Sequence, residues 1–150
     1  MAVWREPLTA ATAIVDEYTV AVSVAAGDGT VVARVLCAHN VAAGYGIFGE
    51  MQIIDDGGSP RQRLRVLVLL VREALRYAAE IGVVRAHTEA PPRMAAFASR
   101  MCGLPGGAAG GRLLFRGEVH AMRSAALDAS DAGGNFADSS VETGANDGRL

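Results

Sequence analysis

The feature that most constrains this chain is a long apolar stretch, Arg61–Ile81, that contains neither glycine nor proline. Leucine, valine and alanine recur along it at the spacing of one helical face, and further apolar residues widen that face. Gly57, Gly58 and Pro60 precede the stretch and Gly82 follows it, and such residues are typical of helix boundaries. The sequence therefore predicts one long helix that other elements cover on more than one side. The residues expected to lie buried against a sheet are Val71, Leu75 and Ala78.

Strand patterns flank this helix on both sides. Alternating apolar and small polar residues surround a glycine-rich turn at residues 27–29, which predicts a β-hairpin. The segment Met1–Glu17 allows a short helix after Pro7. After the long helix, Val83–Thr88 is expected to be a buried parallel strand, because a helix of this length is a natural crossover. The other predicted elements are strands Tyr18–Ala25, Thr30–Ala38 and Tyr45–Ile54, a helix Pro91–Met101, and Leu113–Met122 as a strand or as a hairpin turning at Arg116-Gly117.

The composition favours a single domain in a reducing compartment. The chain has 150 residues, of which 51% are hydrophobic, and this is enough for one α/β domain with a core. No apolar run approaches the roughly 20 residues that a membrane span needs, and the first ten residues lack the apolar core of a signal peptide. We therefore expect no signal peptide, no transmembrane segment, and a cytoplasmic or virion location. Cys37 and Cys102 have neither disulfide nor zinc spacing, so no metal site is expected.

Every basic residue of the chain is an arginine. Arg61, Arg63 and Arg65 form a local cluster, but no aromatic residues interleave with it to stack on bases. The sequence therefore carries no specific nucleic-acid signal, and we expect the cluster to face solvent or a partner protein.

The last part of the chain, residues 124–150, is acidic and of low complexity. Its few sizeable apolar residues before the terminal leucine are Leu127, Phe136 and Val141. Such a segment cannot bury enough apolar surface to offset its ordering entropy, so we expect it to order only on other protein chains of a larger assembly. The predicted organisation is a domain at 1–123 and this acidic segment at 124–150.

The order of strand, basic turn, long helix, Gly82, strand and helix resembles the second half of the Gcn5-related N-acetyltransferase (GNAT) fold. In that family the turn carries the motif Gln/Arg-x-x-Gly-x-Gly/Ala, whose backbone N–H groups bind the pyrophosphate of acetyl-CoA. Counting back from Gly82 places the first motif residue at Gln62 and the two glycine positions at Arg65 and Leu67. Starting from Arg61 instead, they fall on Leu64 and Val66. Both glycines are missing in either register. An arginine side chain could pair with a phosphate, but Leu67 or Val66 would crowd the site.

A second family signature is Asn-x-x-Ala followed by a tyrosine and a Gly-Phe pair, in which the tyrosine often protonates the departing thiolate of CoA. Ala95 and Gly103-Leu104 match this signature, whereas Pro92 stands at the asparagine. Ser99 stands at the tyrosine, and its hydroxyl is a far weaker acid. On the preceding strand, Glu50 lies where some acetyltransferases place their general base. The resemblance thus implies Glu50 and Ser99 as the candidate catalytic residues, with an outward-facing strand residue as the alternative for Glu50.

The resemblance implies an α+β (mixed α/β) fold, a truncated GNAT-like domain with a central, mostly antiparallel sheet and the long helix after the third strand. Because the cofactor motif has degenerated, the expected function is a non-catalytic assembly subunit without a cofactor, similar to small GNAT-like virion proteins of tailed phages. The alternative is an acetyl-CoA-dependent N-acetyltransferase acting on an amine. In that case the cofactor-binding residues implied are Ile53, Ile54, Gln62, Arg63 and Arg65.

Overall fold

The computed structural model describes residues 2–91, 94–102, 106–109 and 112–124, with side chains except at Ala95, Ser99 and 101–116. The strands are β1 (Thr9–Ile14), β2 (Thr19–Ala25), β3 (Val31–Asn40), β4 (Tyr45–Phe48), β5 (Gln52–Ile53), β6 (Arg85–Ala90), β7 (Gly106–Ala109) and β8 (Arg112–Glu118). The helices are α1 (Pro60–Glu80) and α2 (Ala95–Cys102). The predicted acidic segment, from residue 125 onward, lies outside the described residues.

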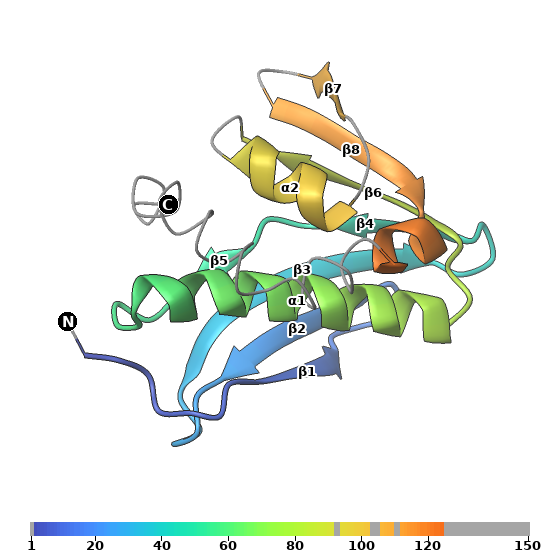
Figure 1. Ribbon diagram of the computed structural model, residues 1–150. Helices are drawn as coiled ribbons and strands as arrows, with labels where there is room; N and C mark the ends of the chain where they lie inside the picture. The colour runs from blue at the N-terminus through green and yellow to red at the C-terminus, as the bar shows by residue number, and fades with distance from the viewer. Residues whose placement is uncertain (1, 92–93, 103–105, 110–111, 125–150) are drawn as a thin grey trace.

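The strands form one sheet in the order β1-β2-β3-β4-β6-β8-β7, with β5 paired to β3. Among the described strands only the β4–β6 pair is parallel, and α1 is the crossover that connects this part of the sheet (Figure 1). The mixed α+β class, the mostly antiparallel sheet and the parallel strand after the long helix are therefore confirmed. Helix α1 packs across β1, β2 and β3, and α2 contacts β8.

Helix α1 begins and ends as its flanking residues predict. Ser59 is the N-cap, Pro60 opens the first turn, and the Ser59 and Gln62 side chains form a reciprocal capping box. At the other end Gly82 has a φ of +87°, the left-handed conformation that commonly ends a helix. The predicted burial of Val71, Leu75 and Ala78 is confirmed.

The core consists of two adjoining apolar clusters on the face of the sheet that α1 covers. In the first, alternate residues of β2 and β3 pack on α1 around Leu70, which is fully buried. In the second, the other buried side of α1 packs on Val83, Val119 and Met122. The helix is thus buried on two sides, as its wide apolar face predicts.

The chain after Pro7 is a strand and not the short helix that the sequence allowed. Strand β1 pairs antiparallel with β2 along its whole length, from Thr9 opposite Ala25 to Ile14 opposite Val20. Strand β1 consists of alanine and threonine except for Ile14, so its pattern has almost no hydrophobic contrast, and the strand is defined by pairing more than by burial. The first strand of the fold is therefore present, and only residues 15–18 separate it from β2.

The chain after β8 also differs from the prediction. Strand β8 ends at Glu118, and residues 119–124 are helical instead of continuing the strand to Met122. Val119 and Met122 are three residues apart, so a helical turn places both on one face, where they are buried. The hairpin partner of β8 is β7, so the chain does not turn at Arg116-Gly117. Neither helix of the described residues is long and apolar enough to cross a membrane.

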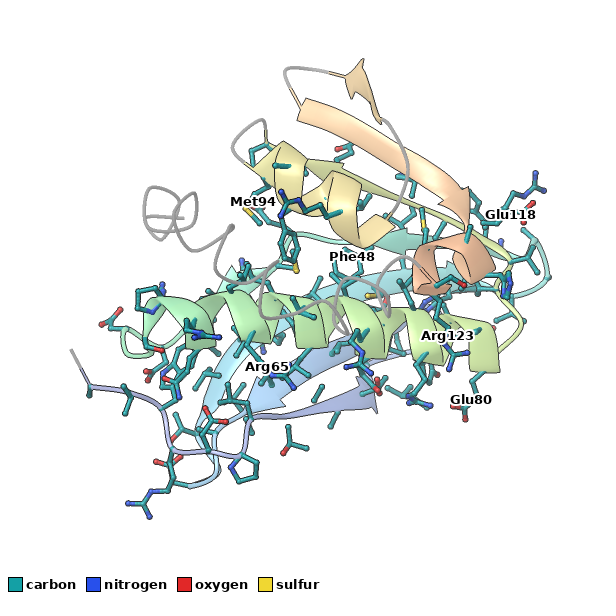
Figure 2. The ribbon with its side chains drawn as sticks, in the orientation of Figure 1. Phe48, Arg65, Glu80, Met94, Glu118 and Arg123 are labelled. Atoms are coloured by element: carbon teal, nitrogen blue, oxygen red, sulfur yellow. The ribbon has the colours of Figure 1, made fainter. Side chains whose placement is uncertain are left out.

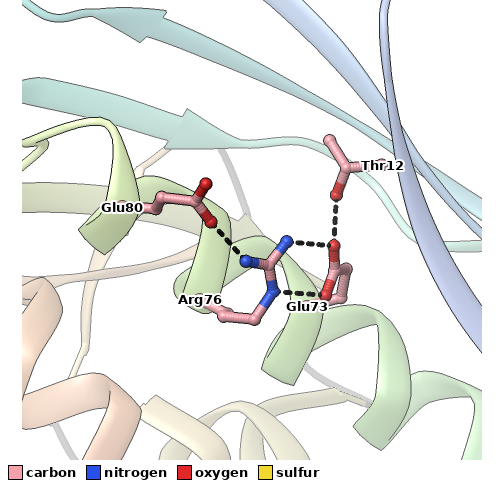
Figure 3. A network of polar contacts seen from close by, with 4 residues as sticks. All are labelled: Thr12, Glu73, Arg76 and Glu80. Atoms are coloured by element: carbon pink, nitrogen blue, oxygen red, sulfur yellow. Dashed lines mark hydrogen bonds and ion pairs between the residues drawn. The ribbon is translucent and has the colours of Figure 1, made fainter.

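A polar network joins α1 to the edge strand β1 (Figure 3). The carboxylate of Glu73 accepts a hydrogen bond from Thr12 at 2.6 Å and two from Arg76 at 2.8 Å, and Arg76 also pairs with Glu80. The Arg76 guanidinium, followed by the Thr12 hydroxyl, holds the pKa of Glu73 below its ordinary value. The charged form of Glu73 therefore stabilises the folded chain above that ordinary value, and the stabilisation is lost as the pH falls through the lowered pKa.

We expect Glu73→Gln to reduce stability modestly at pH 7, because the amide loses the ion pair with Arg76. The matched control is Glu80→Gln, which removes the more exposed partner of the same guanidinium and has a smaller effect. Urea denaturation at pH 7 and about pH 3 measures both variants, and the difference between Glu73→Gln and the parent shrinks at the lower pH. A difference of equal size at both pH values contradicts this assignment.

Candidate functional site

The site begins at an irregularity in the strand that leads to α1. Cys37 of β3 lies opposite Phe48, and Ala33 lies opposite Ile53, so four steps along β3 correspond to five along the neighbouring chain. One extra residue is a β-bulge, which bends a strand and increases its twist. The predicted strand Tyr45–Ile54 is thus one strand interrupted at residues 49–51.

The bulge separates two strands that start out paired. Strand β4 is bonded to β6 up to Phe48 opposite Thr88, and beyond that point β5 stays with β3. A cleft of about 400 Å³ opens where the strands diverge, between α1 and α2. Figure 2 shows Phe48 and Met94 on this side of α1. The larger apolar residues of the cleft are Phe48, Met51, Ile53, Ile54, Leu67, Val71, Leu75, Met94, Phe97 and Met122.

Polar groups lie among these apolar walls. Glu50, His87 and Glu89 line the cleft where the strands part, and Arg63 lines it near the start of α1. The Nδ1 atom of His87 is hydrogen-bonded to the hydroxyl of Tyr45, and the two rings lie 5.4 Å apart at 48°. This pair was missed at the sequence level, because only the parallel register, Ile47 opposite His87, brings the two side chains together.

The first turn of α1 is covered by the N-terminal segment of the chain. The Oε1 atom of Gln62 accepts hydrogen bonds from the backbone N–H of Trp4 at 2.9 Å and of Ser59 at 3.1 Å. Its Nε2 atom donates to the Trp4 carbonyl at 2.8 Å and to the Glu6 carboxylate at 2.7 Å. Both polar atoms of the Gln62 amide therefore have two partners each.

Trp4 closes the turn that precedes the helix. Its indole N–H donates to Asp55 Oδ2 at 2.7 Å, and the same oxygen accepts the backbone N–H of Gly57 at 2.9 Å. These two bonds, the one from Trp4 first, hold the pKa of Asp55 below its ordinary value. A Cβ at Gly58, where φ is +87°, would lie 2.8 Å from the indole ring, so glycine permits this packing.

As a result, four backbone N–H groups of this turn are bonded within the chain. Gly57 donates to Asp55, and Gly58 donates to the Ala2 carbonyl at 2.8 Å. The two other donors, Ser59 and Gln62, bond to each other's side chains in the capping box. The geometry does not fit a bound pyrophosphate, which would need these donors for itself.

Solved structures share this architecture at low sequence identity. Gcn5 of Tetrahymena has a TM-score of 0.53 and 9% identity, over 71% of this chain and 71% of that one. A mutant of the spermidine N-acetyltransferase SpeG of Vibrio cholerae has a TM-score of 0.56 and 12% identity, over 72% of this chain and 69% of that one. A probable acetyltransferase of the GNAT family from Chromobacterium violaceum has a TM-score of 0.52 and 21% identity, over 71% of this chain and 62% of that one.

The chain has the GNAT fold. No protein-family model and no curated protein matches the sequence, so the likeness is one of fold alone. The resemblance inferred from the order of elements is confirmed at that level.

The GNAT motif positions lie inside α1 and not in a turn. Leu64, Val66 and Leu67 are all buried, whereas Arg65 is exposed. The helix already begins at Pro60, so the residues that would replace the motif glycines belong to its first two turns. The apolar ones point into the core and the cleft, and do not project over a phosphate loop.

The predicted cofactor residues are only partly brought together. Ile53, Ile54 and Arg63 line the cleft. The Nη1 atom of Arg63 donates to the carbonyls of Gly57 at 2.8 Å and Asp55 at 3.4 Å. Arg65 lies on the side of α1 turned away from Phe48 and Met94 (Figure 2).

The two predicted catalytic residues lie on different elements. Glu50 is in the bulge and lines the cleft, and its side chain is exposed. Ser99 lies in α2, and its side chain is outside the described residues.

The surroundings of Cys37 and His39 are those of packed side chains. Burial raises the pKa of the Cys37 thiol to about 12, and an unionised thiol is a poor ligand and nucleophile. The rings of His39 and Tyr77 are in tilted contact, with centres 5.8 Å apart and an interplanar angle of 50°. Within the described ranges no group of three or more His, Cys, Asp or Glu side chains could hold a metal ion.

Proposed function

We propose that this chain is a non-catalytic assembly subunit built on the GNAT fold. The observation that carries the proposal is the occupied turn before α1, where Trp4, Asp55 and Gln62 take the backbone and side-chain groups that a pyrophosphate would need. An incoming phosphate would have to displace the Asp55 carboxylate and the Trp4 indole together. The phosphate would also be repelled by the negative charge of the Asp55 carboxylate.

Two further features support an assembly role. Only residues 15–18 connect β1 to β2, so no helix between these two strands can wall a groove for an acceptor substrate. The acidic residues 124–150 suit a partner surface, so we propose that other chains of the assembly bind through this segment. The setting we propose is a particle of the tailed-phage type, with the subunit located in the virion or in the cytoplasm before assembly.

Calorimetry of the full chain with acetyl-CoA tests the proposal. We expect no binding tighter than about 1 mM, or about −4 kcal/mol. The variant Arg65→Gly with Leu67→Gly restores the motif glycines, but it should not restore binding, because both positions lie inside α1 and each glycine costs roughly 1 kcal/mol of helix stability. A micromolar dissociation constant for the parent chain, about −8 kcal/mol, overturns the proposal.

The alternative function is an acetyl-CoA-dependent N-acetyltransferase acting on an amine, and the open cleft that Glu50 lines favours it. An assay with acetyl-CoA and spermidine discriminates the two, since solved neighbours include spermidine N-acetyltransferases. If the parent chain turns over and Glu50→Gln strongly reduces the rate, the result supports the enzyme. The absence of turnover supports the assembly subunit.

A further inference from the structure

The cleft is a gap in the sheet with a strand edge facing it. The N–H of Ile54 donates to the Val32 carbonyl of β3 at 2.8 Å. Successive residues of a strand direct their peptide groups to opposite sides, so the N–H and C=O of Ile53 point away from β3. These two groups of Ile53 point to the side on which β4, the preceding strand, pairs with β6. On that side β5 has no neighbour among the described strands.

The walls of this gap suit an extended polypeptide. An extended chain beside a strand edge gains main-chain hydrogen bonds, and pockets for alternate side chains add specificity. Met51, Met94 and Met122 contribute to the walls, and methionine adapts its shape to different apolar partners. The cleft thus offers both backbone hydrogen bonds and apolar contact to an inserted strand.

Residues 125–150 of the chain itself are a candidate for this inserted strand. Residues 125–150 carry five acids and one arginine, whereas residues 1–124 carry thirteen arginines and eleven acids, so the two parts have opposite net charge. The cleft is lined by Arg63 together with Glu50 and Glu89, and in the described contacts of Arg63 only the Nη1 atom is engaged. The described chain leaves the domain at Ser124, two residues after Met122 of the cleft wall.

The spacing of the apolar residues in this segment favours a second copy as the receptor. Leu127 and Val141 are fourteen residues apart, or about 46 Å when extended. Helix α1 has 21 residues, or about 32 Å, and it forms one side of the cleft. One cleft therefore cannot hold all the apolar residues of the segment, whereas a segment that bridges two copies can use them.

We propose that the cleft of one copy binds the 125–150 segment of a second copy, as an added strand along the Ile53 edge with Phe136 in the apolar part of the cleft. The inference rests on the proposed assembly function, for which it names the receptor site. A segment and a cleft on the same chain give a head-to-tail contact, which can build rings or filaments.

Amide hydrogen exchange of the full chain tests this at about 1 μM and about 500 μM. We expect the Ile53 amide to exchange at least tenfold more slowly at the higher concentration, together with amides of residues 125–150. Phe136→Asp should abolish this change while leaving the buried Leu70 amide unaffected. Glu50→Gln removes a like charge from the cleft and should lower the concentration needed, and Glu17→Gln, remote from the cleft, should not.

A synthetic peptide of residues 125–150, added to the full chain at about 1 μM, should reproduce the protection of Ile53, and its Phe136→Asp form should not. Absence of protection at every concentration overturns the proposal, as does protection that is independent of concentration, which assigns the cleft to the chain's own segment. Calorimetry with acetyl-CoA on the same preparation tests the proposed function separately. Binding of acetyl-CoA refutes the proposed function whether or not the Ile53 amide becomes protected.

Discussion

Replacing Trp4 by alanine should destabilise the folded chain by about 3–5 kcal/mol, the range measured for large aromatic residues cut to alanine in a core. Trp4 is only 6% exposed and belongs to the main apolar cluster, although it lies near the start of the chain. The variant also removes the indole N–H that bonds Asp55. For a chain of this size we expect a fall in melting temperature of about 10 °C or more, measured by calorimetry or circular dichroism.

The matched control is Trp4→Phe, which keeps an aromatic ring but loses the bond to Asp55 and part of the ring area that packs over Gly58. It should destabilise clearly less than alanine does. If Trp4→Ala melts within a degree or two of the parent, the N-terminal segment is not part of the core, and the occupied turn before α1 loses its main support.

Leu75→Ala should cost about 2–5 kcal/mol, as for other buried leucines. Leu75 is 7% exposed in the second apolar cluster and also contributes to the cleft wall. A cavity at this position removes the contacts that Leu75 makes within the cluster that also contains Val83 and Met122. Urea denaturation measures the loss, which is severe for a domain of ordinary stability.

Arg65→Ala is the control for Leu75→Ala, because it changes an exposed residue of the same helix. Its effect should stay within about 0.5 kcal/mol. Equal effects of the two variants would show that the phase of α1 relative to the sheet is wrong.

The long helix and the parallel strand after it could be predicted because their signals are local. The apolar face of Arg61–Ile81 is wide and continuous, and Gly82 marks its end. Strand β1 could not be predicted in the same way, since its alanine and threonine residues carry little hydrophobic contrast, and its place depends on pairing with β2. The helical turn at residues 119–124 likewise depends on a tertiary contact, the burial of Val119 and Met122.

The candidate site shows the same division between local and long-range signals. The loss of the motif glycines was readable from the sequence, but the structure places those positions inside α1 and not in the turn before it. The residues that occupy that turn were not readable, because Trp4 and Gln62 are 58 positions apart and their hydrogen bonds exist only in the fold. The Tyr45–His87 pair was missed for the same reason, since two strands must adopt one register before the side chains meet.

The central claim is that the N–H groups before α1 are already bonded within the chain, and an amide NMR titration with acetyl-CoA tests it most directly. The amides of Gly57 and Gly58 report on the bonds to Asp55 and Ala2. We predict that both resonances keep their positions up to about 1 mM acetyl-CoA, a concentration at which only binding weaker than about −4 kcal/mol goes undetected. Saturable shifts of these two amides at micromolar acetyl-CoA would show that the turn still binds the cofactor and would contradict the account.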